Sequence, residues 1–267
     1  MLPFTKMNGA GNDFVMVDNR DLRFQLSKAD IARLCDRHRG IGADGLIAVE
    51  PALGSAHFRM RYYNADGGEA EMCGNGARCF GRFAARLGGR TDLVTFETLA
   101  GEITAELLGD QVRLAMSQPH SMEIGIRLEV ASIPLEVHSV NTGVPHAVVW
   151  VDDLQKTEVR SLGSALRHHT HFAPKGTNAN FAQRTGPGSI AIRTYERGVE
   201  DETLACGTGM VASALIAHKL FGMSSPIRVK VQGGDTLSIG FVSRPDGFEK
   251  VTLTGPADFV FEGTAPL

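Results

Sequence analysis

The sequence predicts an α/β (α+β) fold of two pseudo-symmetric domains, each a curled mixed sheet or barrel around a central helix. Three observations predict it: a cysteine-glycine motif that occurs twice, short runs of alternating apolar residues, and an apolar helical segment that follows the second motif. The length of 267 residues also suits two domains of ordinary size.

The duplication is inferred from segments that match at nearly the same offset. Residues 72–76 (MCGNG) resemble residues 205–209 (ACGTG), and the two cysteines are 206 − 73 = 133 residues apart. A set of segments in one register predicts two similar domains related by a pseudo-two-fold axis. Offsets of 133 or 134 also join Asn8 to Asn141, 14–18 to 148–152, 42–47 to 176–181, 61–63 to 194–196, and 101–102 to 234–235.

Each half is expected to contain several short strands and one helix. The strands of the first half are predicted at 13–18, 46–50, 58–63, 93–97 and 112–116, and the helices at 77–87 and 210–220. Gly88 and Gly222 supply helix stop signals. The second helix is apolar on nearly every side, which predicts a central position, whereas Arg78, Arg82 and Arg86 predict a solvated stripe on the first helix.

The periodic pattern breaks at 117–125, and this break predicts the domain boundary. We therefore expect an N-terminal domain over 1–118 and a C-terminal domain over 119–254. The tail, residues 255–267, is expected to return to the first domain and complete it.

Composition excludes several classes of protein. With 43% hydrophobic and 21% charged residues and no long apolar run, the chain is not expected in a membrane. The N-terminus lacks an export signal, so a cytoplasmic location is expected. A net charge of −3 without a basic cluster argues against nucleic acid and favours a small-molecule partner. The four cysteines are too few for a disulfide scaffold and are expected to be thiols.

Cys73 and Cys206 each precede Gly-x-Gly and a predicted helix. Unpaired backbone N–H groups and the positive end of the helix dipole favour a thiolate there and can bind a carboxylate. Two such thiols suit the inversion of a carbon that bears hydrogen, because one residue removes a proton from one face and the other delivers a proton to the opposite face. Cys35 and Cys79 lie outside this repeat and are expected to be packing residues.

Metal and cofactor sites are not expected. His168, His169 and His171 form the one histidine-dense stretch, but they lack zinc-motif spacing and are predicted to lie on the surface. The GAGNDF segment is not a dinucleotide fingerprint, because no strand precedes it and the third glycine is missing. Phosphate-loop and pyridoxal-phosphate (PLP) signatures are also missing, so we expect no cofactor.

Six motifs together resemble the diaminopimelate epimerase family: MNGAGNDF, HRGIGADG, NADGGEAEMCGNGARC, NTGVPH, TNANF and YERGVEDETLACGTG. The resemblance spans almost the whole chain. It implies a PLP-independent isomerase that interconverts LL- and meso-diaminopimelate for lysine and peptidoglycan synthesis, with two α/β domains that close over the substrate. It implies catalytic roles for Cys73 and Cys206, with His146 and Glu196 in support, and substrate binding by Asn12, Asn64, Gly74, Asn75, Asn178, Glu196, Arg197, Gly207 and Thr208.

Two positions depart from the family pattern. Gly45 stands where several members have Gln, and Val144 where they have Asn, so each position lacks a polar side chain that would contact the substrate. The distal end of the substrate is then held by water or backbone, or the substrate differs.

Two alternatives stay open: a two-thiol racemase of proline or of a basic amino acid, and a redox-switched binding protein in which Cys73 and Cys206 form a disulfide. For assembly we hypothesise a homodimer.

Overall fold

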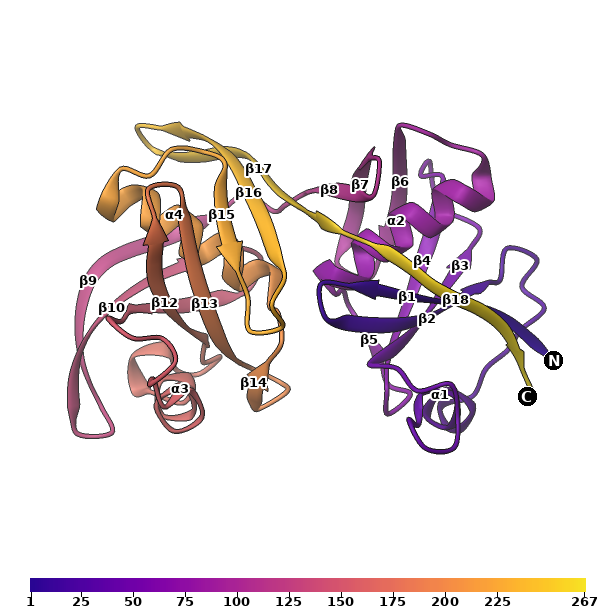
Figure 1. The fold of residues 1–267 in the computed structure, drawn as a ribbon, viewed down its shortest axis with the longest axis horizontal. Coiled ribbons are helices and arrows are strands. Elements are labelled where there is room, and N and C mark those ends of the chain that lie inside the picture. Colours follow the sequence, from indigo (N-terminus) through magenta and orange to yellow (C-terminus); the bar gives the residue numbers. More distant parts are fainter. The chain divides into compact units, whose positions relative to one another are not determined.

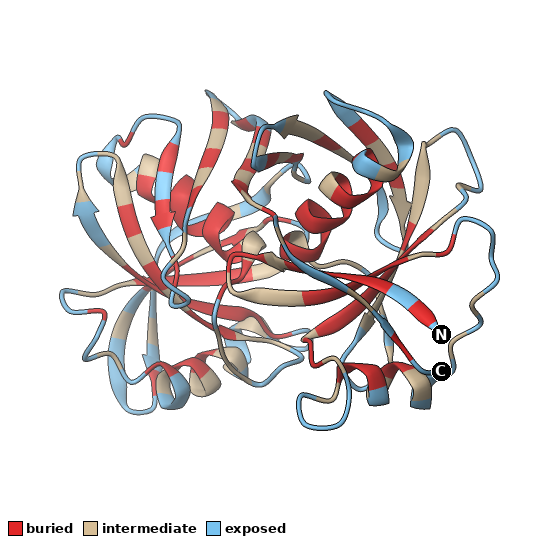
Figure 2. Ribbon diagram, turned by 45° about the vertical axis from the view of Figure 1, so that its right-hand side comes forward, coloured by how far each residue is buried: buried red, intermediate tan, exposed pale blue.

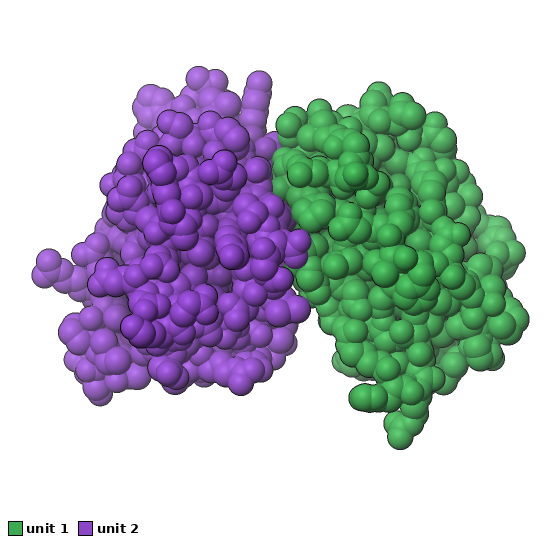
Figure 3. Space-filling view, viewed as in Figure 1, with its two compact units in different colours: residues 1–115, 254–267 green, residues 116–253 purple.

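The computed structural model describes residues 1–267, which separate into two compact units (Figure 3). Unit 1 comprises Met1–Ala115 and Thr254–Leu267, and unit 2 comprises Met116–Leu253. Each unit is built on strands of mixed direction with two α-helices (Figure 1). No helix is long and apolar enough to span a lipid bilayer.

Unit 1 contains most of the elements of the first half of the chain and the last strand. Its helices are α1 (Lys28–Cys35) and α2 (Gly74–Gly88). Its strands are β1 (Leu2–Gly9), β2 (Asn12–Asp18), β3 (Gly45–Glu50), β4 (Phe58–Asn64), β5 (Glu69–Ala70), β6 (Leu93–Thr98), β7 (Gly101–Leu108), β8 (Gln111–Ala115) and β18 (Asp258–Ala265).

Unit 2 repeats this series. Its helices are α3 (Val159–Arg167), the short 3₁₀ helix η1 (Thr170–Phe172) and α4 (Gly207–Phe221). Its strands are β9 (His120–Val130), β10 (Ile133–Asn141), β11 (Pro145–Trp150), β12 (Asn178–Gly186), β13 (Ser189–Glu196), β14 (Asp201–Thr203), β15 (Ile227–Lys230) and β16 (Thr236–Arg244), and β17 (Gly247–Pro256) crosses the boundary between the units.

Strand pairing repeats in the same order in both units. In unit 1, β2 pairs antiparallel with β1 and parallel with β3, and β4 pairs antiparallel with β3 and parallel with β6. In unit 2, β11 pairs antiparallel with β10 and parallel with β12. Likewise, β13 pairs antiparallel with β12 and parallel with β15. Phe14 pairs with Gly45, and Ala147 with Ala179, so the offsets are 147 − 14 = 133 and 179 − 45 = 134. The sequence repeat is therefore a structural repeat.

One helix in each unit is enclosed by strands, as predicted. Helix α2 contacts β1–β4 and β6–β8, and α4 contacts β10–β13, β15 and β16. Residues Gly209–Ala217 of α4 are all buried, and Figure 2 shows mostly buried helices in the middle of each unit. Helix α1 packs on the other face of its sheet, where Ile31 and Leu34 join a core with Val15 and Val17.

The prediction of one helix per unit was wrong, because α1 and α3 are also present. The enclosed helices also begin three residues earlier than predicted, at Gly74 and Gly207. Glycine weakens a helix in isolation, but a Cβ on Gly76 would lie 2.8 Å from Ile47 Cδ1. The glycines therefore permit close packing of the first helical turn on the sheet.

The predicted solvated arginine stripe was wrong at Arg78, which is fully buried. Its Nε donates a hydrogen bond to the carbonyl oxygen of Pro256 at 3.1 Å, and its Nη2 donates to Asn75 Oδ1 at 3.0 Å. Arg86, two turns further along the helix, is exposed. The returning C-terminal chain covers the first part of the stripe and supplies the carbonyl that makes its burial tolerable.

Candidate functional site

Cys73 is the N-cap residue of α2. Its backbone is extended (φ −133°, ψ 122°), and its carbonyl oxygen accepts a hydrogen bond from Ala77 N–H at 2.7 Å. The N–H groups of Gly74, Asn75 and Gly76 lie ahead of this first helical bond, so the helix itself gives them no acceptor. The thiol thus lies beside amides that favour negative charge.

Cys206 occupies the same place in unit 2, at the N-cap of α4. Its backbone is extended (φ −122°, ψ 108°), and its carbonyl oxygen accepts from Met210 N–H at 3.0 Å. The side chain is nearly buried, with Sγ 3.7 Å from Thr208 Oγ1. The helix-start amides here belong to Gly207, Thr208 and Gly209. Both helices have 15 residues and end at a left-handed glycine, so the two settings match closely.

The other two thiols have a different environment. Burial raises the pKa of Cys35 to about 11 and that of Cys79 to about 12. Neither residue caps a helix: Cys35 is the last residue of α1, and Cys79 lies inside α2. Both thiols stay protonated near neutral pH, which fits the packing role expected for them.

Asn12 and Asn75 form a polar chain beside the start of α2. Asn75 Nδ2 donates to Asn12 Oδ1 at 2.6 Å, and Asn12 Nδ2 donates to Asp44 Oδ2 at 2.9 Å. Arg37 bridges Asp44 and Asp13, with Nη2–Oδ1 distances of 2.8 Å to each. The charged groups therefore fix the amide of Asn12. None of the three, Asp13, Arg37 and Asp44, was predicted as a site residue from the sequence.

Asn64 lies on the sheet face that meets α2. Phe14, Gly45 and Asn64 pair across β2, β3 and β4, and directly paired residues share a face. Phe14 is on the helix side, because a Cβ on Gly76 would lie 3.4 Å from its ring. Tyr62 Oη donates to Asn64 Oδ1 at 2.8 Å, which leaves the amide N–H groups of Asn64 to serve as donors.

Gly45 is required by the way β3 meets β4. A Cβ at this position would lie 2.5 Å from the carbonyl oxygen of Tyr63 and 2.8 Å from Tyr62 Cε2. A larger side chain here therefore requires the ladder between the two strands to shift. The departure from the family's Gln thus coincides with a tyrosine that occupies the adjacent space.

We predict that Gly45→Ala lowers the free energy of unfolding by about 1–3 kcal/mol, because the clash is with backbone atoms that cannot rotate away. Gly188→Ala is the matched control, since a Cβ there would meet nothing within 4 Å. Urea unfolding of the two variants measures the difference. Equal stability of both variants would contradict the close packing at Gly45.

Three predicted site residues of unit 2 form one row across its sheet. His146 pairs with Asn178, and the pairing of Ala179 with Tyr195 places Asn178 level with Glu196. Asn178 Nδ2 donates to the carbonyl oxygen of Pro145 at 3.2 Å, while its Oδ1 accepts from Arg197 N–H at 2.8 Å. The register thus gathers His146, Asn178 and Glu196 on one face.

Glu196 is the last residue of strand β13 and Arg197 follows it, and the two side chains have different environments. Burial raises the pKa of the Glu196 carboxyl, and Thr203 Oγ1 donates to its Oε2 at 2.9 Å, which partly offsets the rise. Arg197 Nη1 donates to the carbonyl oxygen of Lys175 at 3.2 Å and forms no ion pair. Its guanidinium therefore keeps donors and an uncompensated charge for an anionic ligand.

His146 is buried and uncharged. Its pKa is lowered to about 3, mainly by burial and also by the positive charge of Arg197. Its Nδ1 lies 3.1 Å from Nδ2 of Asn180, a fully buried residue that the sequence reading missed. The alternation of TNANF indicates that Asn178 and Asn180 share a strand face, and this was the available signal.

We predict that His146 makes the protein sensitive to acid. In the unfolded chain the imidazole binds a proton below its ordinary pKa of 6.5. In the folded protein its pKa is about 3, so it stays neutral until the pH falls to about that value. Stability from this residue is therefore complete above pH 6.5 and falls toward pH 3, by on the order of 1 kcal/mol per pH unit. The measurement is the unfolding free energy of wild type minus that of His146→Gln against pH, and a flat difference would contradict the prediction.

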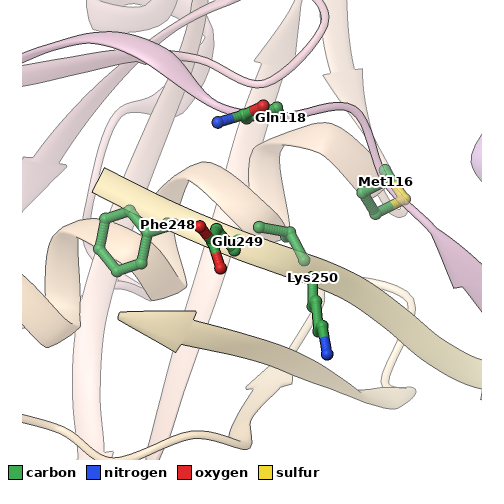
Figure 4. Close-up of a pocket in the computed structure, with 6 residues that line it drawn as sticks. Met116, Gln118, Phe248, Glu249 and Lys250 are labelled. Atoms are coloured by element: carbon green, nitrogen blue, oxygen red, sulfur yellow. The ribbon is translucent and has the colours of Figure 1, made fainter. Parts of the chain in front are cut away.

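Two surface hollows, one in each unit, are lined by other residues. In unit 2, a hollow of about 120 Å³ is lined by the start of β17 and the segment at Met116 and Gln118 (Figure 4). In unit 1, a hollow of about 270 Å³ is lined by Asp18, Arg20, Asp21 and Arg23. The predicted site residues therefore lie outside these two hollows.

The histidine-dense stretch lies at the end of α3 and in η1, with its side chains half-buried or exposed. The structure brings together no group of three or more His, Cys, Asp or Glu side chains that suits a metal ion. His168 instead lies near Glu200, with 4.0 Å between Nε2 and Oε2.

Comparison with known proteins decides the family. A family model described as diaminopimelate epimerase matches residues 4–121 and 138–260. The chain belongs to the diaminopimelate epimerase family. It is 44% identical to the diaminopimelate epimerase of Chlorobaculum tepidum, over 98% of this chain and 100% of that protein. It is 43% identical to that of Aquifex aeolicus, over 98% and 97% of the respective chains.

Solved structures support the fold of this family member. A phenazine biosynthesis protein of the PhzF family from Bacillus anthracis matches with a TM-score of 0.75 at 14% identity, covering 100% and 99% of the two chains. A probable proline racemase from Agrobacterium radiobacter matches with a TM-score of 0.71 at 15% identity, covering 100% and 93%. These likenesses confirm the predicted two-domain α/β architecture.

Proposed function

We propose that this chain epimerises LL-diaminopimelate to meso-diaminopimelate without a cofactor, with Cys73 and Cys206 as the two acid–base groups. The observation that carries the proposal is that each cysteine is the N-cap of a 15-residue helix at matching points of a duplicated fold. Membership of the diaminopimelate epimerase family, and 44% identity to a diaminopimelate epimerase, support the substrate.

The chemistry follows from the properties of a thiol at a helix start. Removing the α-proton builds negative charge that spreads into the adjacent carboxylate of the amino acid. N–H groups of Gly74, Asn75, Gly207 and Thr208 are the donors that would stabilise this charge. One cysteine as thiolate takes the proton and the other as thiol delivers one to the opposite face, so each turnover leaves the two with exchanged protonation states. Proton exchange with solvent then restores the starting state.

The distal amino-acid end of the substrate requires its own partners. We assign binding of the distal carboxylate to Arg197, whose charge has no acidic partner. Asn12, Asn64 and Asn178 are assigned to the polar ends of the substrate. We assign Glu196 to the substrate ammonium group. A racemase of proline does not need these distal contacts, and this difference favours diaminopimelate over the alternative.

In the cell, this activity would supply precursors for lysine and peptidoglycan, and we place it in the cytoplasm. The test is purified protein incubated with LL-diaminopimelate and no added cofactor, followed by chiral separation of the stereoisomers. Formation of the meso isomer is expected, with L-proline as the control substrate that stays unchanged. Racemisation of proline with no change in diaminopimelate would overturn the assignment.

A further inference from the structure

Asn180 is a buried residue whose side-chain amide forms hydrogen bonds through both its nitrogen and its oxygen. It lies on β12, on the same face as Asn178, and its side chain contacts three groups. Its Nδ2 lies 2.9 Å from the carbonyl oxygen of Ala147 and 3.1 Å from His146 Nδ1, and its Oδ1 accepts from Thr194 Oγ1 at 2.9 Å. These contacts fix the orientation of the amide, because a flip would exchange its nitrogen and oxygen atoms and break them.

The contacts of Asn180 fix the proton of His146. A carbonyl oxygen only accepts hydrogen bonds, so the amide atom that faces Ala147 must be the nitrogen. The same nitrogen carries a second hydrogen, which it donates to His146 Nδ1. Because Nδ1 is an acceptor, a neutral His146 must carry its proton on Nε2.

The Nε2–H group of His146 is buried and meets no hydrogen-bond acceptor of the folded chain. Buried polar groups without a partner are uncommon and need an explanation, of which a bound ligand is one. The depressed pKa of His146 keeps the ring neutral, so it offers a fixed donor and not an exchangeable charge. Such a group suits the recognition of an anionic oxygen.

Asn180 also connects His146 to the start of α4. A Cβ on Gly209 would overlap Asn180 Oδ1, and the same Cβ would lie 3.3 Å from Cys206 Sγ. Asn180 therefore contacts the first turn of α4 beside the catalytic thiol. Glycine at 209 is what allows this contact, because any larger residue would place its Cβ against the amide oxygen of Asn180.

We propose that Asn180 is a positioning residue that locks His146 in the Nε2–H form, and that this N–H donates a hydrogen bond to a carboxylate of the bound amino-acid substrate. The proposal rests on the proposed function and deepens it. It makes His146 a neutral donor, where the sequence reading gave it a supporting catalytic role.

Three variants of His146 separate a donor from an acid or base. Glutamine places an amide N–H near the position of Nε2, asparagine places one near Nδ1, and alanine places none. With LL-diaminopimelate, His146→Gln is expected to keep KM within roughly 5-fold of wild type, while His146→Asn and His146→Ala raise it roughly 10- to 100-fold at similar kcat. An equal loss of kcat in all three variants would overturn the donor role.

A nuclear magnetic resonance measurement tests the tautomer without activity. In protein with ¹⁵N-labelled histidines, the signal of His146 is the one of nine that disappears in His146→Gln. A neutral ring protonated at Nε2 is expected, and protonation at Nδ1 or at both nitrogens would overturn the proposal. In Asn180→Ala the preference for Nε2–H is expected to weaken, and an unchanged signal would remove the role of Asn180.

The two measurements keep this proposal separate from the proposed function. If wild type does not convert LL-diaminopimelate, the proposed function fails while the resonance data still decide the tautomer. If wild type converts it and the glutamine variant is as impaired as the alanine variant, the proposed function stands and the donor role fails.

Discussion

Cys73→Ala and Cys206→Ala are each expected to lower the rate of conversion of LL- to meso-diaminopimelate by roughly 10²- to 10⁴-fold. Each substitution removes one of the two groups that move a proton, and general acid–base catalysis by one residue contributes this much. The loss is expected in kcat, because alanine leaves the helix-start amides that bind the carboxylate in place. Initial rates in both directions measure it.

Cys35→Ala and Cys79→Ala are the matched controls, because burial keeps both thiols protonated and neither caps a helix. Both controls are expected to retain most activity at a temperature where they are folded. Similar losses in all four variants would contradict the assignment of Cys73 and Cys206.

Arg197→Ala is expected to raise KM for LL-diaminopimelate by roughly 100-fold, since the substitution removes a charged pair of donors from the substrate carboxylate. The backbone N–H of residue 197 still donates to Asn178 Oδ1, so the local fold is expected to persist. Arg197→Lys is expected to recover only part of the affinity, because lysine lacks the planar fork.

Arg193→Ala is a control for the loss of a nearby arginine. Arg193 is paired with Glu202, with an Nε–Oε1 distance of 2.6 Å, and therefore has no free charge for substrate. The Arg193→Ala substitution is expected to lower the free energy of unfolding and to leave KM for LL-diaminopimelate nearly unchanged. A KM of Arg197→Ala close to that of wild type would show that another group binds the distal carboxylate.

The sequence predicted the elements that rest on periodicity. Strand β2 was expected at 13–18 and lies at Asn12–Asp18, and the apolar segment 210–220 lies within α4. Helix α1 was missed although Ser27 and Asp30 form a capping box, a readable signal at its start. The helix starts at Gly74 and Gly207 were missed because glycine is a poor helix former and its packing on the sheet is a tertiary effect.

The placement of the candidate site residues in the fold was predictable as far as residue type and the repeat allow. The positions of Cys73 and Cys206 before a helix followed from the motif, and the resemblance supplied Asn178 and Arg197. The hydrogen bonds of Asn180 did not follow, because they depend on strands β11, β12 and β13 meeting in one register. The burial of Arg78 depends on a carbonyl 256 − 78 = 178 residues away, and no local pattern reports it.

Isotope transfer at the inverted carbon tests the two-thiol account most directly. LL-diaminopimelate is incubated with enzyme in deuterated water, and product and unreacted substrate are analysed by mass spectrometry at low conversion. With one group removing the proton and a second delivering another, the meso product is expected to carry one deuterium while unreacted LL substrate carries none. Meso product that retains the substrate hydrogen, or recovered LL substrate that gains deuterium as fast as product forms, would contradict the account.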